Sequence, residues 1–315
     1  MDFLEWTNNR VLPKALQSRS GWVKLFEHYR TVEPHIHQIE PTNACNYACV
    51  MCPRDKEMTR NIGYMEMSVY KSIIDEISTY APKIREKEIE LFHFGESLFH
   101  PELLTMIRYA SEAGLRPTLS INPANLTDEH LSHLLLHNPY KLIISLDSLD
   151  RQKYRSIRGP CADLDRAIHN IEVILDQHQR MRSATNIIIR MIVMHSNRYE
   201  IKNFREFWKS RGGKTEFREF FPWNKKELIG LGNIQKYPRS MPCPFPWQYM
   251  VVQWNGDVVP CCRDYNGILA LGNVADTSLQ KIWNGERYQE FRRNMADGDK
   301  VSSLCHECLA LYRTE

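Results

Sequence analysis

Nine cysteines in two groups constrain this chain more than any other feature of its sequence. One group occupies a single short loop, and the other is spread over the last quarter of the chain. The first contains Cys45, Cys49 and Cys52, the second contains Cys243, Cys261, Cys262, Cys305 and Cys308, and Cys161 stands alone between them. Because the count is odd and no apolar signal segment precedes the first group, a disulfide framework is a poor interpretation. The spacing instead predicts two separate metal or catalytic centres.

Composition excludes two large classes of protein. Lysine and arginine number 41 against 38 acidic residues, so the net charge of +3 does not indicate a nucleic-acid-binding surface. No apolar run approaches the ~18 residues that a membrane span needs. We therefore expect a cytoplasmic protein with neither nucleic acid nor membrane among its partners.

The first cysteine group has the spacing C-x3-C-x2-C and follows a short apolar run at 35–41. Three thiolates on one loop can hold three irons of a [4Fe–4S] cluster, because soft sulfur ligands suit iron–sulfur chemistry. The fourth iron is then open to a substrate or cosubstrate. Zinc is the weaker alternative, since structural zinc takes four ligands and no histidine stands at a suitable short distance.

Strand-length apolar runs alternate with helix-period segments through the first two thirds of the chain. Six such units predict a parallel α/β sheet, but periodicity alone leaves both a barrel and a doubly wound open sheet possible. In a barrel, functional residues gather where the strands end. Strands are expected at 35–41, 88–94, 116–121, 141–147, 186–194 and 215–221, and helices at 67–80, 101–113, 127–136, 162–178 and 199–210.

The pattern changes after residue 221. A proline- and glycine-rich stretch leads to alternating apolar residues around Asn255-Gly256, which predict a β-hairpin. The hairpin ends at the adjacent pair Cys261 and Cys262. Counting Cys243, Cys261, Cys305 and Cys308 gives a closed four-thiolate site. From chemistry alone this site suits either zinc or a second [4Fe–4S] cluster.

The three-cysteine loop after the first strand resembles the signature of radical S-adenosylmethionine (SAM) enzymes. The C-terminal pattern resembles the twitch and SPASM modules of that family, in the shortened form with one auxiliary cluster. The resemblance implies a (β/α)6 partial TIM barrel at 35–221 and a small cluster-binding domain at 222–315. It leaves residues 1–34 unplaced, and their apolar positions predict a helical preface. It also implies two [4Fe–4S] clusters, SAM, and a reducing partner such as flavodoxin or ferredoxin.

The resemblance also suggests which residues contact SAM. Gly95 and Glu96 stand where family members carry a Gly-Gly-Glu segment, although Phe94 replaces the first glycine. A glycine permits close backbone approach, and a carboxylate can accept hydrogen bonds from the SAM ammonium group. Met51 occupies a position that is often aromatic in the family. The expected SAM contacts are Met51, Gly95, Glu96, Asn122, Ser145 and Arg190, with Arg158 as a further candidate for the SAM carboxylate.

The outcome of the reaction depends on Cys262, which no cluster requires. The favoured interpretation is an epimerase acting on a small polar substrate, a sugar or an aminoglycoside-like molecule, with the Cys262 thiol returning a hydrogen atom to a carbinol carbon. The alternatives are a dehydrogenase that passes an electron to the auxiliary cluster, a peptide-modifying enzyme and a non-enzymatic zinc-binding module. A dehydrogenase needs a base, for which Glu216, Glu219 and Asp147 are candidates. Cys161 is interpreted as an incidental thiol.

Overall fold

The computed structural model describes residues 18–223, 226–234, 236–238 and 240–312 of the chain. The first half of the predicted helical preface lies outside these residues. Its second half forms the helix α2 (Arg19–Tyr29), which Ser18 caps by accepting a hydrogen bond from the Gly21 N–H.

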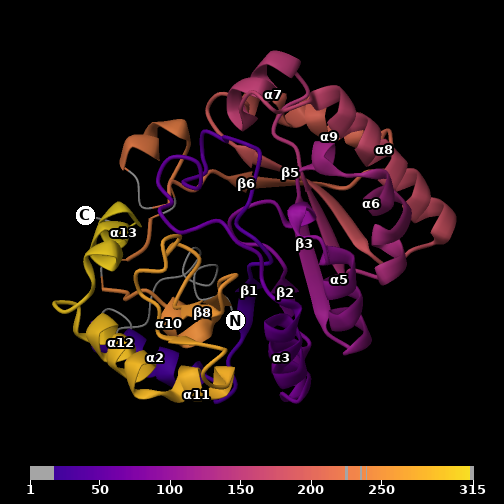
Figure 1. Cartoon of the computed structure of the whole chain (residues 1–315). Coiled ribbons are helices and arrows are strands. Elements are labelled where there is room, and N and C mark those ends of the chain that lie inside the picture. Colours follow the sequence, from indigo (N-terminus) through magenta and orange to yellow (C-terminus); the bar gives the residue numbers. More distant parts are fainter. Residues whose placement is uncertain (1–17, 224–225, 235, 239, 313–315) are drawn as a thin grey trace.

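Six parallel strands form the first part of a single sheet and follow one another in chain order (Figure 1). A doubly wound sheet would reverse its strand order part-way, so this order identifies the partial barrel and decides between the two predicted alternatives. All six predicted strand positions are confirmed, although the second strand ends earlier than expected. The strands are β1 (Ile36–Ile39), β2 (Glu88–Glu90), β3 (Arg116–Ile121), β4 (Lys141–Ser145), β5 (Asn186–Val193) and β6 (Thr215–Glu219).

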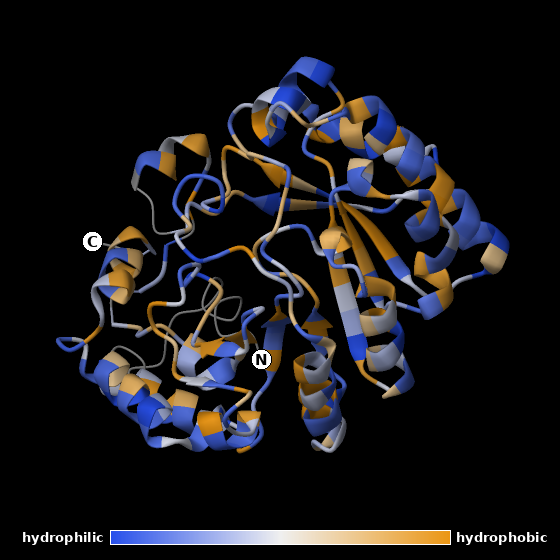
Figure 2. Ribbon diagram, viewed as in Figure 1, coloured by the Kyte–Doolittle hydropathy of each residue, from blue (hydrophilic) through white to orange (hydrophobic). Residues whose placement is uncertain are grey.

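Helices cover the outer face of these strands (Figure 1). Alternate strand residues such as Leu119, Leu142 and Ile189 are fully buried against apolar helix residues, and together they form the main hydrophobic core. In Figure 2 hydrophobic and hydrophilic colours alternate along the strands, and hydrophilic colour is common on the helices at the outside. The helices are α3 (Met67–Ser78), α4 (Pro82–Arg85), α5 (Leu103–Glu112), α6 (Asp128–His133), α7 (Arg151–Arg158), α8 (Leu164–Met181) and α9 (Ile201–Lys209).

The C-terminal region extends the barrel sheet. β7 pairs in parallel with β1, and β8 and β9 follow antiparallel, so nine strands make one continuous sheet. The predicted hairpin is confirmed. The sequence pattern changes at residue 221, but the sheet is not interrupted there, because strands from both sides of this position belong to it. The elements are α10 (Phe245–Gln248), β7 (Met250–Val252), β8 (Asp257–Val259), β9 (Gly272–Asn273), α11 (Leu279–Asn284), α12 (Glu286–Asp297) and α13 (Ser303–Tyr312).

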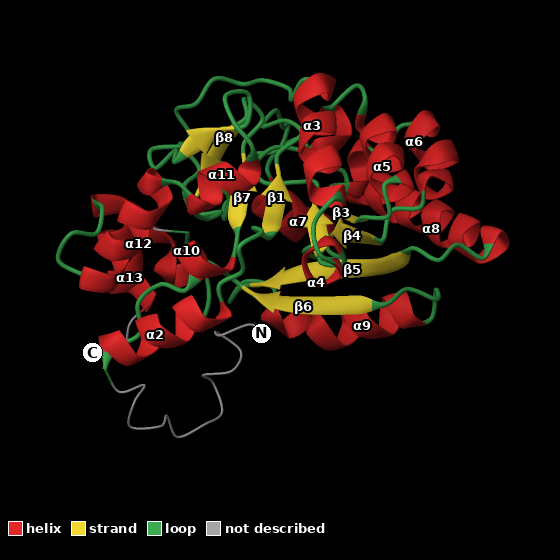
Figure 3. Cartoon of the chain, turned by 90° about the horizontal axis from the view of Figure 1, so that it is seen from below, coloured by secondary structure: helices red, strands yellow, loops and turns green. Residues whose placement is uncertain are grey.

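The helix α2 packs on this C-terminal region, although it precedes the barrel in the chain (Figure 3). The Phe26 and Trp247 rings lie 5.5 Å apart, and Trp247 Nε1 donates to Glu27 Oε1 at 2.6 Å. Trp22 and Met295 belong to the same small core. The described part of the preface therefore supports the C-terminal region. Among the described residues, no helix is long and apolar enough to cross a membrane.

Candidate active site

The three-cysteine loop (residues 43–53) begins just after β1, at the edge of the sheet where all six barrel strands end. Backbone hydrogen bonds fix it to two neighbouring segments. The Glu96 N–H donates to the Ala44 carbonyl at 2.7 Å, and the Val50 N–H donates to the Ile157 carbonyl at 2.9 Å. The loop is therefore anchored to the turn after β2 and to the end of α7.

The three thiols of this loop are partly buried. Burial raises the pKa of Cys45 to about 11 and that of Cys52 to about 12, and it also raises the pKa of Cys49. Thiols with such pKa values stay protonated at neutral pH unless a metal ion or cluster displaces the proton. Three soft sulfur donors on a partly open loop fit three irons of a cluster that keeps its fourth iron accessible.

Gly95 lets the turn after β2 lie directly against the three-cysteine loop. Its φ is +91°, and an added Cβ would stand 2.5 Å from the Thr42 carbonyl oxygen and 2.6 Å from the Asn43 Cα. Any other residue would push the two segments apart and would adopt this φ only with strain. Gly95 of the predicted Gly-Glu segment therefore has to be glycine for structural reasons, and it lies where we expected a contact with SAM.

Glu96 belongs to a buried polar network across the ends of three strands. Its Oε2 accepts hydrogen bonds from the Asn122 backbone N–H (2.8 Å) and from Asn122 Nδ2 (2.6 Å). Arg158 Nη1 donates to Asn122 Oδ1 at 2.7 Å, and Arg158 Nε donates to Asp147 Oδ2 at 2.5 Å. The structure therefore brings three predicted SAM-site residues together, namely Glu96, Asn122 and Arg158.

The other predicted contacts lie apart from this network. Met51 packs beside Ile157, Met194 and Phe220, near the ends of β5 and β6. Ser145 Oγ lies 3.3 Å from Ser120 Oγ. Both residues lie beside the loop or the strand ends, and their contact with SAM stays a prediction.

The pKa of Glu96 predicts how SAM binding depends on pH. Burial raises this pKa to about 7, against opposing hydrogen bonds from Asn122 and Leu98. Only the ionised carboxylate attracts an ammonium group, so we expect SAM affinity to rise roughly tenfold between pH 6 and pH 8. Equilibrium dialysis under anaerobic conditions measures the effect. Glu96→Gln is expected to bind SAM more weakly with a flat pH profile, and a wild-type profile that is already flat would contradict this role.

The face of the barrel strands that points away from the helices is mostly polar. Strand register places polar residues of six strands on this concave face. Several of them pair: Gln38 Nε2 donates to Glu90 Oε2 (2.7 Å), and Arg190 Nε donates to Glu216 Oε2 (2.7 Å). Such a surface suits a small substrate with many hydroxyl or amine groups. Its polar members are Gln38, Glu88, Glu90, Arg116, Thr118, Ser120, Lys141, Ser145, Asn186, Arg190, Glu216 and Arg218, and Ile143, Ile188 and Ile192 lie among them.

The second group of cysteines surrounds an apolar cavity of about 60 Å³. Since one water needs about 10–15 Å³, this space accommodates a larger group. All four predicted ligands line it, from the loop before α10, the end of the hairpin and α13: Cys243, Cys261, Cys305 and Cys308. Burial raises the pKa of Cys243 to about 12 and that of Cys305 to about 11.

The spacing of the thiols favours a cluster over a single ion. Within the described ranges, no three His, Cys, Asp or Glu side chains form a group that could hold one metal ion. A zinc ion would draw its sulfur ligands to about 2.3 Å from one point, whereas these thiols stand around a cavity. Four separated thiols fit a multi-iron cluster.

Cys262 lies beside one end of the polar face. Burial raises its pKa to about 11; Arg263 opposes this effect, and the nearby Glu90 carboxylate adds to it. His93 Nε2 lies 3.0 Å from the Cys262 carbonyl oxygen, which ties the turn after β2 to the end of the hairpin. The backbone of Cys262 is therefore fixed close to the end of β2. Cys161, in contrast, is exposed.

The structure separates the three candidate bases. Asp147 is fully buried and accepts hydrogen bonds from Arg158 and from the Ile192 N–H (2.8 Å). Glu219 pairs with Arg198 at 2.6 Å and lies on the opposite strand face from Glu216. Glu216 alone of the three lies on the polar face, where Arg190 and Arg218 lower its pKa against the opposing effect of burial.

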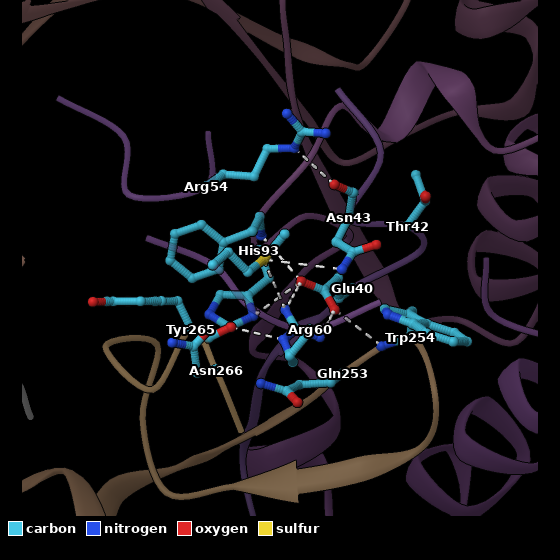
Figure 4. Close-up of polar contacts among 12 residues, drawn as sticks. Glu40, Thr42, Asn43, Arg54, Arg60, His93, Gln253, Trp254, Tyr265 and Asn266 are labelled. Atoms are coloured by element: carbon cyan, nitrogen blue, oxygen red, sulfur yellow. Dashed lines mark hydrogen bonds and ion pairs between the residues drawn. The ribbon is translucent and has the colours of Figure 1, made fainter. Parts of the chain in front are cut away.

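A buried ion pair at the end of β1 was not predicted (Figure 4). The Glu40 carboxylate accepts two 2.8 Å hydrogen bonds from Arg60 and one from the Trp254 N–H at 3.1 Å. His93 Nδ1 lies 3.5 Å away without hydrogen-bond geometry. The only sequence signal was a glutamate that directly follows an apolar strand.

Comparison with known proteins places this site in a family. Residues 39–207 match the model of the radical SAM superfamily, which is more than half of the chain. This chain belongs to the radical SAM superfamily. Residues 243–309 match the SPASM iron–sulfur cluster-binding domain, and this range holds the four cysteines of the cavity. The cofactors of this radical SAM protein are two [4Fe–4S] clusters and SAM, and the zinc-binding alternative is wrong.

Two named relatives extend over most of the chain. An S-adenosyl-L-methionine-dependent 2-deoxy-scyllo-inosamine dehydrogenase of Niallia circulans is 24% identical over 86% of this chain and 91% of the relative. A tungsten-containing aldehyde ferredoxin oxidoreductase cofactor-modifying protein of Pyrococcus furiosus is 21% identical over 81% and 82% of the two chains.

Solved structures share the fold at lower identity. BtrN in complex with AdoMet and 2-DOIA has a TM-score of 0.55 at 19% identity and covers 86% of this chain and 91% of its own. Streptococcus suis SuiB bound to its precursor peptide SuiA has a TM-score of 0.67 at 14% identity, covering 85% and 69%. These likenesses confirm the radical SAM fold with its C-terminal SPASM domain.

Proposed function

We propose that this radical SAM protein is a dehydrogenase that oxidises one carbinol carbon of a small, polar, hydroxyl- and amine-bearing ring to a ketone. The observation that carries the proposal is the position of the polar concave face. The three-cysteine loop follows β1 at the edge where the strands end, and Glu90, the last residue of β2, lies at the same edge, near enough to Cys262 to raise the pKa of its thiol; Cys262 directly follows Cys261 of the four-thiol cavity. A substrate bound at the strand-end edge of this face would lie near the three-cysteine loop and near Cys262, the neighbour of a cavity cysteine.

The relatives support an oxidation over the epimerisation that the sequence favoured. The relative from Niallia circulans is named a dehydrogenase and matches nearly the whole of both chains. Its named substrate is an aminocyclitol, which is the kind of molecule that the polar face suits. The two reactions differ after the hydrogen atom has been removed from the substrate. In the dehydrogenase the auxiliary cluster accepts an electron from the substrate radical, whereas in the epimerase the radical receives a hydrogen atom.

The residues of this chain have distinct roles in the proposal. Cys45, Cys49 and Cys52 hold the open cluster, and Cys243, Cys261, Cys305 and Cys308 hold the auxiliary cluster. When bound, SAM and the two clusters supply a radical that removes a hydrogen atom from the carbinol carbon, and an acceptor for one electron. Gly95, Glu96 and Asn122 form the SAM-binding edge.

A carboxylate must take the hydroxyl proton that leaves as the ketone forms. Glu216 lies on the polar face but is paired with two arginines. Glu90 lies on the same face with a partly exposed side chain, 3.6 Å from His37 Nε2. The His37 ring can pass the proton onward from Glu90, so Glu90 is the better placed of the two bases. Neither residue of this pair was predicted.

Epimerisation is the second candidate, because Cys262 adjoins Glu90. In that reaction the Cys262 thiol returns a hydrogen atom to the substrate, and Cys262→Ala loses all product. In the dehydrogenase, Cys262 fills space beside the auxiliary cluster, and Cys262→Ala keeps forming product. For either reaction, we also propose a reducing cytoplasm as the location and flavodoxin or ferredoxin as the electron donor.

The test is the mass of the product formed anaerobically from 2-deoxy-scyllo-inosamine and related aminocyclitols with SAM and dithionite. We expect a ketone lighter than the substrate by the mass of H2, with wild type and with Cys262→Ala. A product of unchanged mass that disappears with Cys262→Ala would establish the epimerase instead.

A further inference from the structure

Arg263 forms part of the wall of the four-thiol cavity. It directly follows the pair Cys261 and Cys262, and its Nη1 lies 2.6 Å from the Cys308 Sγ. The residue is only 9% exposed, so water screens its charge little. The guanidinium therefore donates a charge-assisted hydrogen bond to one of the four sulfurs.

Aromatic rings from three segments hold the guanidinium in this place. It lies 4.2 Å from the centre of the Phe221 ring, 4.1 Å from that of Tyr312 and 5.6 Å from that of Phe245. Cation–π contacts of this kind fix the orientation of an arginine without neutralising it. The Nε has no hydrogen-bond partner among the described residues. The neighbours that stabilise its charge are sulfur and phenol groups instead of a carboxylate.

The other centre has an arginine with the opposite arrangement. Arg158 lies near the Cys49 thiol, whose hydrogen bond goes to the Arg158 carbonyl at 3.8 Å. Its guanidinium, however, is paired with Asp147 and Asn122. The positive charge near the three-cysteine loop is therefore balanced, whereas the charge in the four-thiol cavity is not.

We propose that Arg263 raises the reduction potential of the auxiliary cluster. Reduction adds one negative charge to a cluster, and a buried cation that donates to a ligand sulfur stabilises the reduced form more than the oxidised form. Arg263 is thus a tuning residue that makes the second centre an electron acceptor relative to the first. The effect follows from charge and distance, whichever reaction the substrate undergoes.

The test is a redox titration of the anaerobically reconstituted holoenzyme, followed by electron paramagnetic resonance. Arg263→Met removes the charge at similar length, and Arg263→Lys keeps the charge but loses the planar fork. Arg292→Met is the matched control, because Arg292 is also buried and stacks on Trp283 at 4.2 Å, but it does not line the cavity. Iron content and thermal unfolding are measured for every variant.

For Arg263→Met we expect the auxiliary potential to fall by at least a tenfold change in the reduction equilibrium, or 59 mV for one electron. Arg263→Lys should show a smaller fall, and the control should leave both potentials unchanged. An unchanged auxiliary potential in a fully loaded Arg263→Met would overturn the proposal. If that variant loads no auxiliary cluster, Arg263→Gln, which also removes the charge, takes its place, and an unchanged auxiliary potential in that variant would overturn the proposal. The ketone assay tests the proposed dehydrogenase separately. The potential can depend on Arg263 whether or not a ketone forms, and a ketone can form whether or not Arg263 affects the potential.

Discussion

Cys49→Ala is expected to abolish reductive cleavage of SAM. The three-cysteine loop has no fourth thiol to replace Cys49, since the other cysteines lie in the second centre or, for Cys161, at an exposed position. Loss of an outer-shell partner alone commonly costs about 10–100-fold in metal affinity or activity, and loss of a direct ligand costs more. We therefore expect 5′-deoxyadenosine formation to fall by more than about 100-fold. Iron should fall from about eight to about four per chain.

Cys161→Ala is the matched control for this experiment. Its thiol is exposed, so its removal should leave both iron content and SAM cleavage near the wild-type values. Chromatographic detection of 5′-deoxyadenosine together with iron analysis provides the measurement. Wild-type SAM cleavage by Cys49→Ala would contradict the assignment of the open cluster to this loop.

Glu40→Ala should destabilise the protein by about 3–5 kcal/mol, because it leaves a nearly buried Arg60 without its partner. The variant also leaves the Trp254 N–H without its acceptor at the point where the hairpin meets β1. We expect this loss in the free energy of unfolding from denaturant titration of the anaerobic holoenzyme. Glu219→Ala is the control, since its exposed pair with Arg198 should contribute less than about 1 kcal/mol.

The Glu40 effect should depend on pH in a defined direction. Burial alone would raise the pKa of Glu40, but Arg60 and His93 outweigh it and lower the pKa to about 2 from its usual 4.5. A carboxylate with a lowered pKa in the folded state stabilises the protein fully above its unfolded-state pKa. The difference between wild type and Glu40→Ala should therefore be complete above about pH 4.5 and shrink as the pH falls toward 2. A difference that grows on acidification would contradict this account.

Local sequence patterns predicted most of the barrel. Apolar runs of strand length and the helical period between them were sufficient, since each depends on a few neighbouring residues. The two cysteine groups were predictable for the same reason: ligand spacing on one loop is a local property. The order of the strands could not be predicted from local patterns. The fold was decided only by the structure, in which β1 to β6 lie side by side in chain order.

The parts that sequence could not predict depend on contacts between distant segments. β7 has three residues, and its parallel pairing with β1 joins positions more than 200 residues apart. Glu40, Arg60 and Arg263 are ordinary charged residues until the fold buries Glu40 against Arg60 and Arg263 against the Cys308 thiol. Glu90 was hidden inside a predicted strand, because an alternating pattern does not say which polar residues face a substrate.

The most direct test of the proposed dehydrogenase is the reaction in deuterated water with an aminocyclitol that the enzyme accepts. We predict a ketone lighter than the substrate by the mass of H2, no alcohol product that carries solvent deuterium, and one 5′-deoxyadenosine for each ketone formed. An inverted alcohol that carries one solvent-derived deuterium at the carbinol carbon, and that Cys262→Ala fails to form, would contradict it.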